Sequence, residues 1–246
     1  MTVKNFVLIN CVHLTFLISL HLYYIKTDYK MIKITLPDGS IKEFEAGITP
    51  FDVAKSISDG LARSIISASF NGTTIETTTE LTTDGSLILY TFNDDDGKKA
   101  FWHSSAHVLA QTILEFHPNT KLTIGPAIDN GFYYDVDFGK HILSEKDFPR
   151  IEKRMIEISR EKHLFKLKSK AKKEALDYYK KQENDYKVEL IENLEDVSIT
   201  FCDHDNLTDL CKGGHLPHTG FIKAVKLLSV AGAYWRADQN KKQLTR

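Results

Sequence analysis

The sequence MIKITLPDGSIKEFEA, residues 31–46, contains two runs of alternating apolar and polar residues on either side of Asp38-Gly39. This is the pattern of two strands joined by a tight turn. Thr49-Pro50 follows, and a threonine cap before a proline is typical of a helix start. We therefore predict a hairpin and then a helix.

Three further features complete a small module. The helix is expected to end at Gly60, and strands are predicted over residues 64–70 and 86–92. The order strand–strand–helix–strand–strand suits a ubiquitin-like β-grasp module over residues 31–93, which is within the size range of small domains.

A second module of α+β type is predicted over residues 98–246, after the polar boundary NDDDG at residues 93–97. Helical spacing of apolar residues predicts a helix over residues 102–116. Ser144 and Asp147 form the capping-box pattern that begins another helix.

Shorter elements are predicted within this second module. The DNG turn at residues 129–131 precedes an expected strand over residues 132–138. The remaining pattern predicts a strand, a helix and a strand in that order: residues 165–168, 169–181 and 186–191.

The first thirty residues differ from the rest of the chain. Residues 6–25 read FVLINCVHLTFLISLHLYYI, a stretch nearly free of charge and close to the roughly 20 residues of a membrane span. A signal peptide or membrane anchor is one interpretation. Because a clean domain start follows Met31, we expect residues 1–30 to be a dispensable extension or a mis-assigned start.

Composition excludes several classes of protein. The 246 residues are 42% hydrophobic and 26% charged, which is ordinary for a globular chain and unlike a disordered one. Three cysteines, Cys11, Cys202 and Cys211, are too few for a disulfide scaffold and fit a reducing cytoplasm. The sequence contains no phosphate-binding loop, dinucleotide-binding loop or nucleophile elbow.

Charge is balanced overall but uneven along the chain. Lys plus Arg number 32 against 33 Asp plus Glu, yet residues 160–181 hold nine basic residues and three acidic ones. Such a segment could follow a phosphate backbone, or it could be a solvated helix face.

Two histidines stand out in the motif HSSAH. His103 and His107 are four residues apart on a predicted helix, so both imidazoles project from one face. Alone, this spacing is weak evidence for a functional pair.

The second motif is DLCKGGHLPH, which contains Asp209, Cys211, His215 and His218. A cysteine and a histidine four residues apart in a glycine-rich loop are consistent with half of a metal site. The alternative is a buried cysteine beside a surface turn. The two motifs together could supply a set of three histidines and one cysteine.

Taken in order, these segments resemble the N-terminal half of bacterial threonyl-tRNA synthetases. The resemblance covers residues 31–246 and rests on the following matches: HSSAHVLAQ, LTIGPAIDNGFYYDVDF, the EKRM helix, YKVELIEN, DLCKGGHLPHTG and GAYWRADQNKKQLTR. It implies a TGS domain of β-grasp fold followed by the α+β editing domain that alanyl-tRNA synthetase relatives share.

The resemblance implies hydrolysis of mischarged Ser-tRNA(Thr) by an activated water, in support of threonyl-tRNA aminoacylation. A site that recognises threonine by its hydroxyl also accepts serine, because one missing methyl discriminates only about 10- to 200-fold. A second site must then remove the serine.

The resemblance also assigns roles to residues. The catalytic set is His103, His107, Cys211, His215 and Lys187, with one imidazole or Lys187 as the base or orienting group. The expected substrate-binding residues, which hold the seryl group or the terminal adenosine, are Tyr134, Asp209, Lys212 and Gly213.

No cofactor is expected to be required for editing, although the three histidines and Cys211 could bind zinc as in alanyl editing domains. The expected partner is the acceptor end of tRNA(Thr), in the cytoplasm, with no membrane unless residues 1–30 are real. The chain stops at QLTR, where the family continues into its catalytic and anticodon-binding domains. We therefore expect it to lack the parts that bind ATP, catalytic zinc and the anticodon. The remainder of the synthetase is a further expected partner if it is encoded separately.

One departure from the family pattern lies in the candidate site. The loop reads CKGGH, residues 211–215, where the family usually has CRGPH, so its stiffness and one positive contact are expected to differ. Three other interpretations stay open: a free-standing deacylase acting in trans, a non-catalytic tRNA-binding module, and a zinc hydrolase with another substrate.

Overall fold

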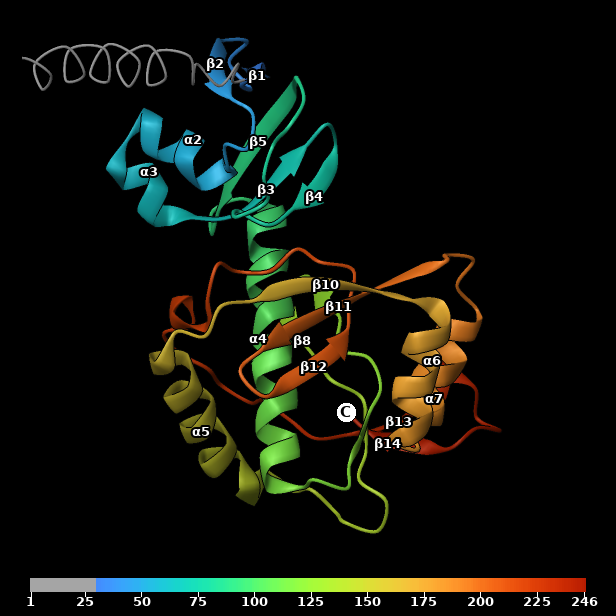
Figure 1. The fold of residues 1–246 in the computed structure, drawn as a ribbon. Helices are drawn as coiled ribbons and strands as arrows, with labels where there is room; N and C mark the ends of the chain where they lie inside the picture. The colour runs from blue at the N-terminus through green and yellow to red at the C-terminus, as the bar shows by residue number, and fades with distance from the viewer. Residues whose placement is uncertain (1–29) are drawn as a thin grey trace, which may run out of the picture.

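The computed structural model describes residues 30–246, so the apolar stretch at residues 6–25 lies outside the described residues. Figure 1 shows two units: the first lies at the N-terminal end of a long helix, α4 (Asp95–Phe116), and the second surrounds the rest of that helix. Among residues 30–246, no helix combines the length and the apolar character that crossing a membrane requires.

The first unit is a five-stranded sheet with the order β2-β1-β5-β3-β4. Its strands are β1 (Met31–Thr35), β2 (Ile41–Glu45), β3 (Ile65–Phe70), β4 (Thr73–Ile75) and β5 (Gly85–Thr91). β1 pairs antiparallel with β2 and parallel with β5, which is the arrangement of a β-grasp fold. The predicted hairpin is confirmed, while β4 was not predicted.

Two short helices, α2 (Pro50–Ile57) and α3 (Asp59–Ser64), cover this sheet. Thr49 caps α2 by accepting a hydrogen bond from the Asp52 backbone N–H, as predicted. The expected end at Gly60 is wrong. The first helix ends at Ile57 because Ser58 is extended and its hydroxyl caps a second helix, which contains Gly60.

α4 begins earlier than predicted and joins the two units. The acidic segment that was expected to be a boundary forms its cap and first turn, with Asp94 as the capping residue. Gly97 is buried in the helix, and Ile66 of β3 contributes to the same apolar core as Ala106 and Ile113 of α4. The first unit therefore packs directly on the helix that carries the HSSAH motif.

The second unit wraps α4 with three small sheets and three helices (Figure 1). The helices are α5 (Phe148–Glu161), α6 (Lys172–Lys181) and α7 (Asp185–Glu192). The sheets are β10 (Lys166–Ala171)–β11 (Ser198–His204)–β12 (Leu207–Leu210), β13 (Gly232–Tyr234)–β14 (Gln243–Thr245)–β9 (Val136–Asp137)–β6 (Lys121–Leu122), and β7 (Ala127–Ile128)–β8 (Gly131–Phe132). Three short 3-10 turns complete it: η1 (Glu145–Asp147), η2 (Thr219–Phe221) and η3 (Trp235–Ala237).

Some predictions for this unit are confirmed and others are corrected. The capping box of Ser144 and Asp147 is present ahead of α5, and the turn at residues 129–131 joins β7 to β8. The expected strand at residues 132–138 is broken into the end of β8 and β9, and residues 169–171 belong to strand β10 rather than to the following helix.

The predicted strand at residues 186–191 is wrong, because this segment is the helix α7. The Asn184 side chain accepts a hydrogen bond from the Lys187 backbone N–H and caps the helix. Lys187 and Ile191, one turn apart, are its buried residues. The helical form directs the Lys187 side chain toward the interior.

Candidate functional site

His103 and His107 occupy one face in the middle of α4, as predicted. Their ring centroids are 4.7 Å apart with an edge-to-face geometry. Ser104 lies between them, and its hydroxyl donates to the Ala100 carbonyl and accepts from the Leu216 backbone N–H at 2.9 Å. Because Leu216 follows His215, this small residue fixes the CKGGH loop against the helix.

The CKGGH loop brings Cys211 between two histidines. The Cys211 Sγ lies 2.9 Å from His103 Nε2 and 3.1 Å from His215 Nε2, and it accepts a weaker contact from the Gly213 N–H at 3.4 Å. Gly213 and Gly214 have φ values of +95° and +83°, a conformation that glycine adopts readily. Proline, with φ near −65°, could not take the place of Gly214 in this loop.

These contacts set the protonation of the Cys211–His215 pair. Burial raises the pKa of the Cys211 thiol, but the surrounding imidazoles, with hydrogen bonds from His103 and His215, outweigh it and hold that pKa well below its ordinary value. Burial lowers the pKa of His215, but hydrogen bonds with Cys202, Cys211 and Glu76 raise it well above its ordinary value. The geometry therefore favours a thiolate beside an imidazolium.

His107 is in a different state. It is 3% exposed, and neither ring nitrogen has a hydrogen-bond partner among residues 30–246. Its Nδ1 faces Asp209 Oδ2 at 3.8 Å. Burial lowers the pKa of His107 below its ordinary value, so its imidazole is neutral near pH 7.

Asp209 is the centre of a buried polar network. The Lys187 ammonium lies 2.5 Å from Asp209 Oδ1, and both residues are almost fully buried. The hydroxyls of Tyr134 and Tyr179 donate to the same carboxylate at 2.8 and 3.2 Å. Because the charges are paired and the oxygens are hydrogen-bonded, the contacts of this network offset part of the cost of burying the two groups.

Four other residues named from the sequence lie outside the histidine–cysteine cluster itself. Tyr134 and Asp209 contact each other in the interior, and Lys212 is exposed at the start of the loop. His218 lies apart from the cluster, where its ring packs on Phe221 with centroids 4.8 Å apart.

Three other residues of the site were not predicted from the sequence. Glu76, in the first unit, contacts His215 Nδ1 through its Oε1 at 2.9 Å. His204 on β11 lies beside His107, and burial lowers its pKa to about 3. Tyr179 on α6 donates to Asp209. Glu76 and Tyr179 are far from both motifs in sequence, so local patterns gave no signal for them. His204 is five residues before Asp209, outside the second motif, and no spacing linked it to that motif.

The donor set suits a metal ion by residue type. One ligand atom from each of His103, His107, Cys211 and His215 lies within 4.8 Å of all the others. Three imidazoles and a thiolate are ligands that zinc accepts. The two sulfur–nitrogen separations match hydrogen bonds, however, and are shorter than the separation of about 3.5 Å between ligands of a tetrahedral zinc ion.

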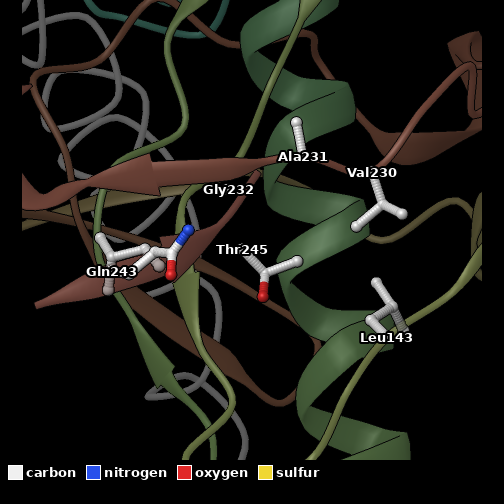
Figure 2. Close-up of a pocket in the computed structure, with 7 residues that line it drawn as sticks. Leu143, Val230, Ala231, Gly232, Gln243 and Thr245 are labelled. Atoms are coloured by element: carbon white, nitrogen blue, oxygen red, sulfur yellow. The ribbon is translucent and has the colours of Figure 1, made fainter.

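A surface pocket of about 330 Å³ lies elsewhere in the second unit (Figure 2). Leu143 lines it together with residues 230–232 and 243–245 of the β13–β14 region. No titratable side chain lines this pocket, so acid–base chemistry is not supported there. The histidine–cysteine cluster is the better candidate site.

One known domain family matches within each of the two units. The family model of the TGS domain matches residues 32–91, and that of the threonyl and alanyl tRNA synthetase second additional domain matches residues 197–246. The second match contains β11, β12 and the CKGGH loop.

Similar proteins carry the name threonine--tRNA ligase. The chain is 68% identical to one from Flavobacterium psychrophilum and 53% identical to one from Cytophaga hutchinsonii, each over 216 residues or 88% of the chain. It is 46% identical over 226 residues, 92% of the chain, to one from Caldanaerobacter subterraneus. The chain spans about a third of the length of these relatives: 33%, 34% and 35%. It therefore corresponds to the N-terminal part of the threonyl-tRNA synthetase family, with a TGS domain followed by the second additional domain.

Proposed function

We propose that the chain hydrolyses the ester bond of mischarged aminoacyl-tRNA, with Ser-tRNA(Thr) as its substrate. The observation that carries this proposal is the cluster of three histidines around Cys211, next to the Lys187–Asp209 pair. Imidazoles can take up and return a proton near pH 7, which ester hydrolysis by water requires. In the full-length relatives this activity would support threonyl-tRNA aminoacylation.

The substrate approaches from the side of His103. This residue is the half-buried member of the cluster, while His107, Cys211 and His215 are buried. If the Cys211 thiolate accepts a hydrogen bond from His103 Nε2–H, then His103 Nδ1 holds the lone pair that faces an incoming water.

The reaction is a balanced hydrolysis. Water attacks the ester carbonyl carbon and gives its proton to the imidazole. The bond between that carbon and the ribose oxygen then breaks, and the ribose oxygen receives the proton. The products are serine and tRNA with a free terminal hydroxyl.

Lys187 acts as a support in this scheme rather than as the base. Its ammonium is held by Asp209, and Asp209 in turn faces His107 Nδ1. Asp209 Oδ2 lies 3.8 Å from that nitrogen, too far for a hydrogen bond, so the pair acts on His107 through the field of its charges. Selectivity for serine requires that the added methyl of threonine be excluded sterically from the same cleft.

We propose that this chemistry needs no obligatory metal. The distances from Cys211 Sγ to the Nε2 atoms of His103 and His215 are those of hydrogen bonds and are shorter than the distance between two ligands of one zinc ion. If zinc were bound, His103, His107, Cys211 and His215 would hold it, and it would polarise the ester carbonyl. The expected macromolecular partners are the acceptor end of tRNA(Thr) and, where it is made separately, the rest of the synthetase, in the cytoplasm.

The test is deacylation of Ser-tRNA(Thr) against Thr-tRNA(Thr) by the full chain, with and without a chelator. We expect rapid loss of serine and retention of threonine in both conditions. His103→Ala and Cys211→Ala are each expected to lower the rate by about 100-fold or more, because each removes part of the proton-transfer machinery. His141→Ala, an exposed histidine outside the cluster, is the matched control.

Three results would count against parts of the proposal. Binding of tRNA without turnover would favour a non-catalytic module. Activity that disappears with the chelator and returns with zinc would favour a metal hydrolase. Full activity in both alanine variants, with circular dichroism unchanged, would show that the chemistry lies elsewhere.

A further inference from the structure

We propose that Glu76 of the first unit is a positioning residue of the hydrolytic site: it fixes His215 and the backbone of the CKGGH loop from across the boundary between the units. The expected effect on kcat rests on the proposed function, whereas the expected effect on the His215 ring can be measured independently. It assigns the first unit a part in the chemistry of the second.

The contact is dense and buried. Glu76 is 8% exposed, and its Oε1 lies 2.9 Å from His215 Nδ1. The same oxygen accepts from the backbone N–H groups of Gly214 at 3.1 Å and His215 at 3.3 Å, while Oε2 accepts from His215 N–H at 3.1 Å. Glu76 is 138 and 139 residues away from these partners in sequence.

These contacts hold a hydrogen atom on the Nδ1 nitrogen of the His215 ring. Both carboxylate oxygens of Glu76 already accept backbone hydrogen bonds, so the oxygen facing Nδ1 is an acceptor and Nδ1 is the donor. The other nitrogen, Nε2, is then directed to Cys211 Sγ at 3.1 Å. A carboxylate that accepts from one nitrogen of a functional histidine keeps that nitrogen protonated and fixes the ring plane.

The loop is shaped to receive this carboxylate. Successive backbone N–H groups converge on one point when neighbouring residues adopt unusual φ values, and such a concavity binds anions. Gly213 and Gly214, both at positive φ, present the N–H groups of Gly214 and His215 in this way. Glu76 fills the concavity, since a Cβ added to Gly213 would lie 3.5 Å from its Oε1.

The backbone around Glu76 is held within the first unit. Glu76 follows β4 directly, and its carbonyl accepts from the Thr79 N–H at 3.1 Å. The next residue, Thr77, is buried and its carbonyl accepts from the Phe51 N–H of α2 at 3.0 Å. The carboxylate is therefore anchored to the β-grasp sheet and helix rather than to a loose loop.

The experiment compares Glu76→Ala, Glu76→Gln and Glu80→Gln in the full chain. Glutamine keeps an oxygen that can accept from Nδ1 and the loop, whereas alanine removes every acceptor. Glu80 is an exposed acid four residues away and serves as the matched control. The two readouts are the nitrogen chemical shifts of the His215 ring and the kcat and KM for Ser-tRNA(Thr) deacylation.

We expect Glu76→Ala to remove the fixed Nδ1–H state of His215 and to lower kcat by about 10- to 100-fold with little change in KM, as for other residues that orient a functional histidine. Glu76→Gln should retain the Nδ1–H state and most of kcat, and Glu80→Gln should match the wild type. If Glu76→Ala does not fold, the glutamine variant decides: loss of the Nδ1–H state in a folded Glu76→Gln protein overturns the proposal.

Separate measurements test hydrolysis by the wild-type protein and positioning of His215 by Glu76. A wild-type protein that hydrolyses no aminoacyl-tRNA contradicts the proposed function, while the His215 spectrum still reports on positioning. A Glu76→Ala protein with the wild-type spectrum and the wild-type kcat overturns the positioning role. A Glu76→Gln protein as slow as a folded Glu76→Ala protein also overturns it, because charge rather than orientation would then matter.

Discussion

Replacement of Lys187 tests how much the buried ion pair with Asp209 contributes to stability. Its ammonium is almost fully buried against Asp209, and two tyrosine hydroxyls complete the carboxylate shell. We expect Lys187→Met to lower the free energy of unfolding by about 3–5 kcal/mol, because it leaves a buried charge without its partner. Denaturant titration of the variant measures this loss.

The double variant Lys187→Met/Asp209→Asn is the control for this prediction. Since it removes both charges, its loss of unfolding free energy should be clearly smaller than the sum of the losses in the two single variants. A double variant whose loss of unfolding free energy equals the sum of the two single losses would show that the two charges do not interact.

The sequence predicted the members of the site that lie in local motifs. Spacing of four residues on a helix placed His103 and His107 on one face, and the glycine-rich loop marked Cys211 and His215. Glu76 could not be predicted in this way, because its contact with His215 depends on how two separate units pack. A glutamate in a polar segment reads as an ordinary surface residue until that packing is known.

Among the helices and strands, the β-grasp hairpin and the starts of α2 and α5 could be predicted from the sequence, because their turn and cap residues act locally. The segment that forms α7 was predicted to be a strand. Its short apolar pattern fits either period, so the helix is decided by the Asn184 cap and by burial of Lys187 and Ile191 on one side. Tertiary contacts thus overrode a weak local preference.

The α4–α5 contact leads to a prediction about acid stability. Arg154 of α5 donates to both oxygens of Glu115 on α4, from Nε at 2.6 Å and Nη2 at 3.1 Å. The Arg154 hydrogen bond lowers the pKa of Glu115 below its ordinary value of 4.5, against the opposing effect of burial. The stability from this pair is therefore fully present above about pH 4.5 and is lost as pH falls through the lower pKa of the folded protein.

We expect Glu115→Gln to lower the free energy of unfolding at pH 7 by about 1 kcal/mol or less, since solvent partly screens the pair. The difference from the wild type should shrink as the pH is lowered below 4. Urea titrations across this range test the prediction, with the exposed Glu192→Gln as control. A difference that is constant with pH would contradict it.

At the scale of the whole molecule, α4 joins the two units and depends on a glycine where it passes beneath the first sheet. A Cβ at Gly97 would lie 1.9 Å from the Thr91 carbonyl oxygen and 3.4 Å from Ile66 Cδ1. Alanine normally favours a helix over glycine by about 1 kcal/mol. Here we expect Gly97→Ala to destabilise the protein by about 1–3 kcal/mol, because the backbone oxygen cannot move away easily.

Gly60→Ala provides the matched comparison, because Gly60 also lies in a helix but its added Cβ would meet only Ser58 Oγ, at 3.8 Å. That variant is expected to gain about 0.5–1 kcal/mol. Thermal and denaturant unfolding of the two variants measure the contrast. A Gly97→Ala protein as stable as Gly60→Ala would show that the units do not pack tightly at α4.

The contact between Glu76 and His215 also bears on how these domains can be exchanged between proteins. The matched TGS segment ends at residue 91, so a recombination joint placed there would look harmless by sequence alone. Such a chimera would take the acceptor for His215 from one parent and the histidine from the other. Its two halves could each fold, yet His215 would lose the partner of its Nδ1 unless the parent of the first half carries a hydrogen-bond acceptor where this chain has Glu76.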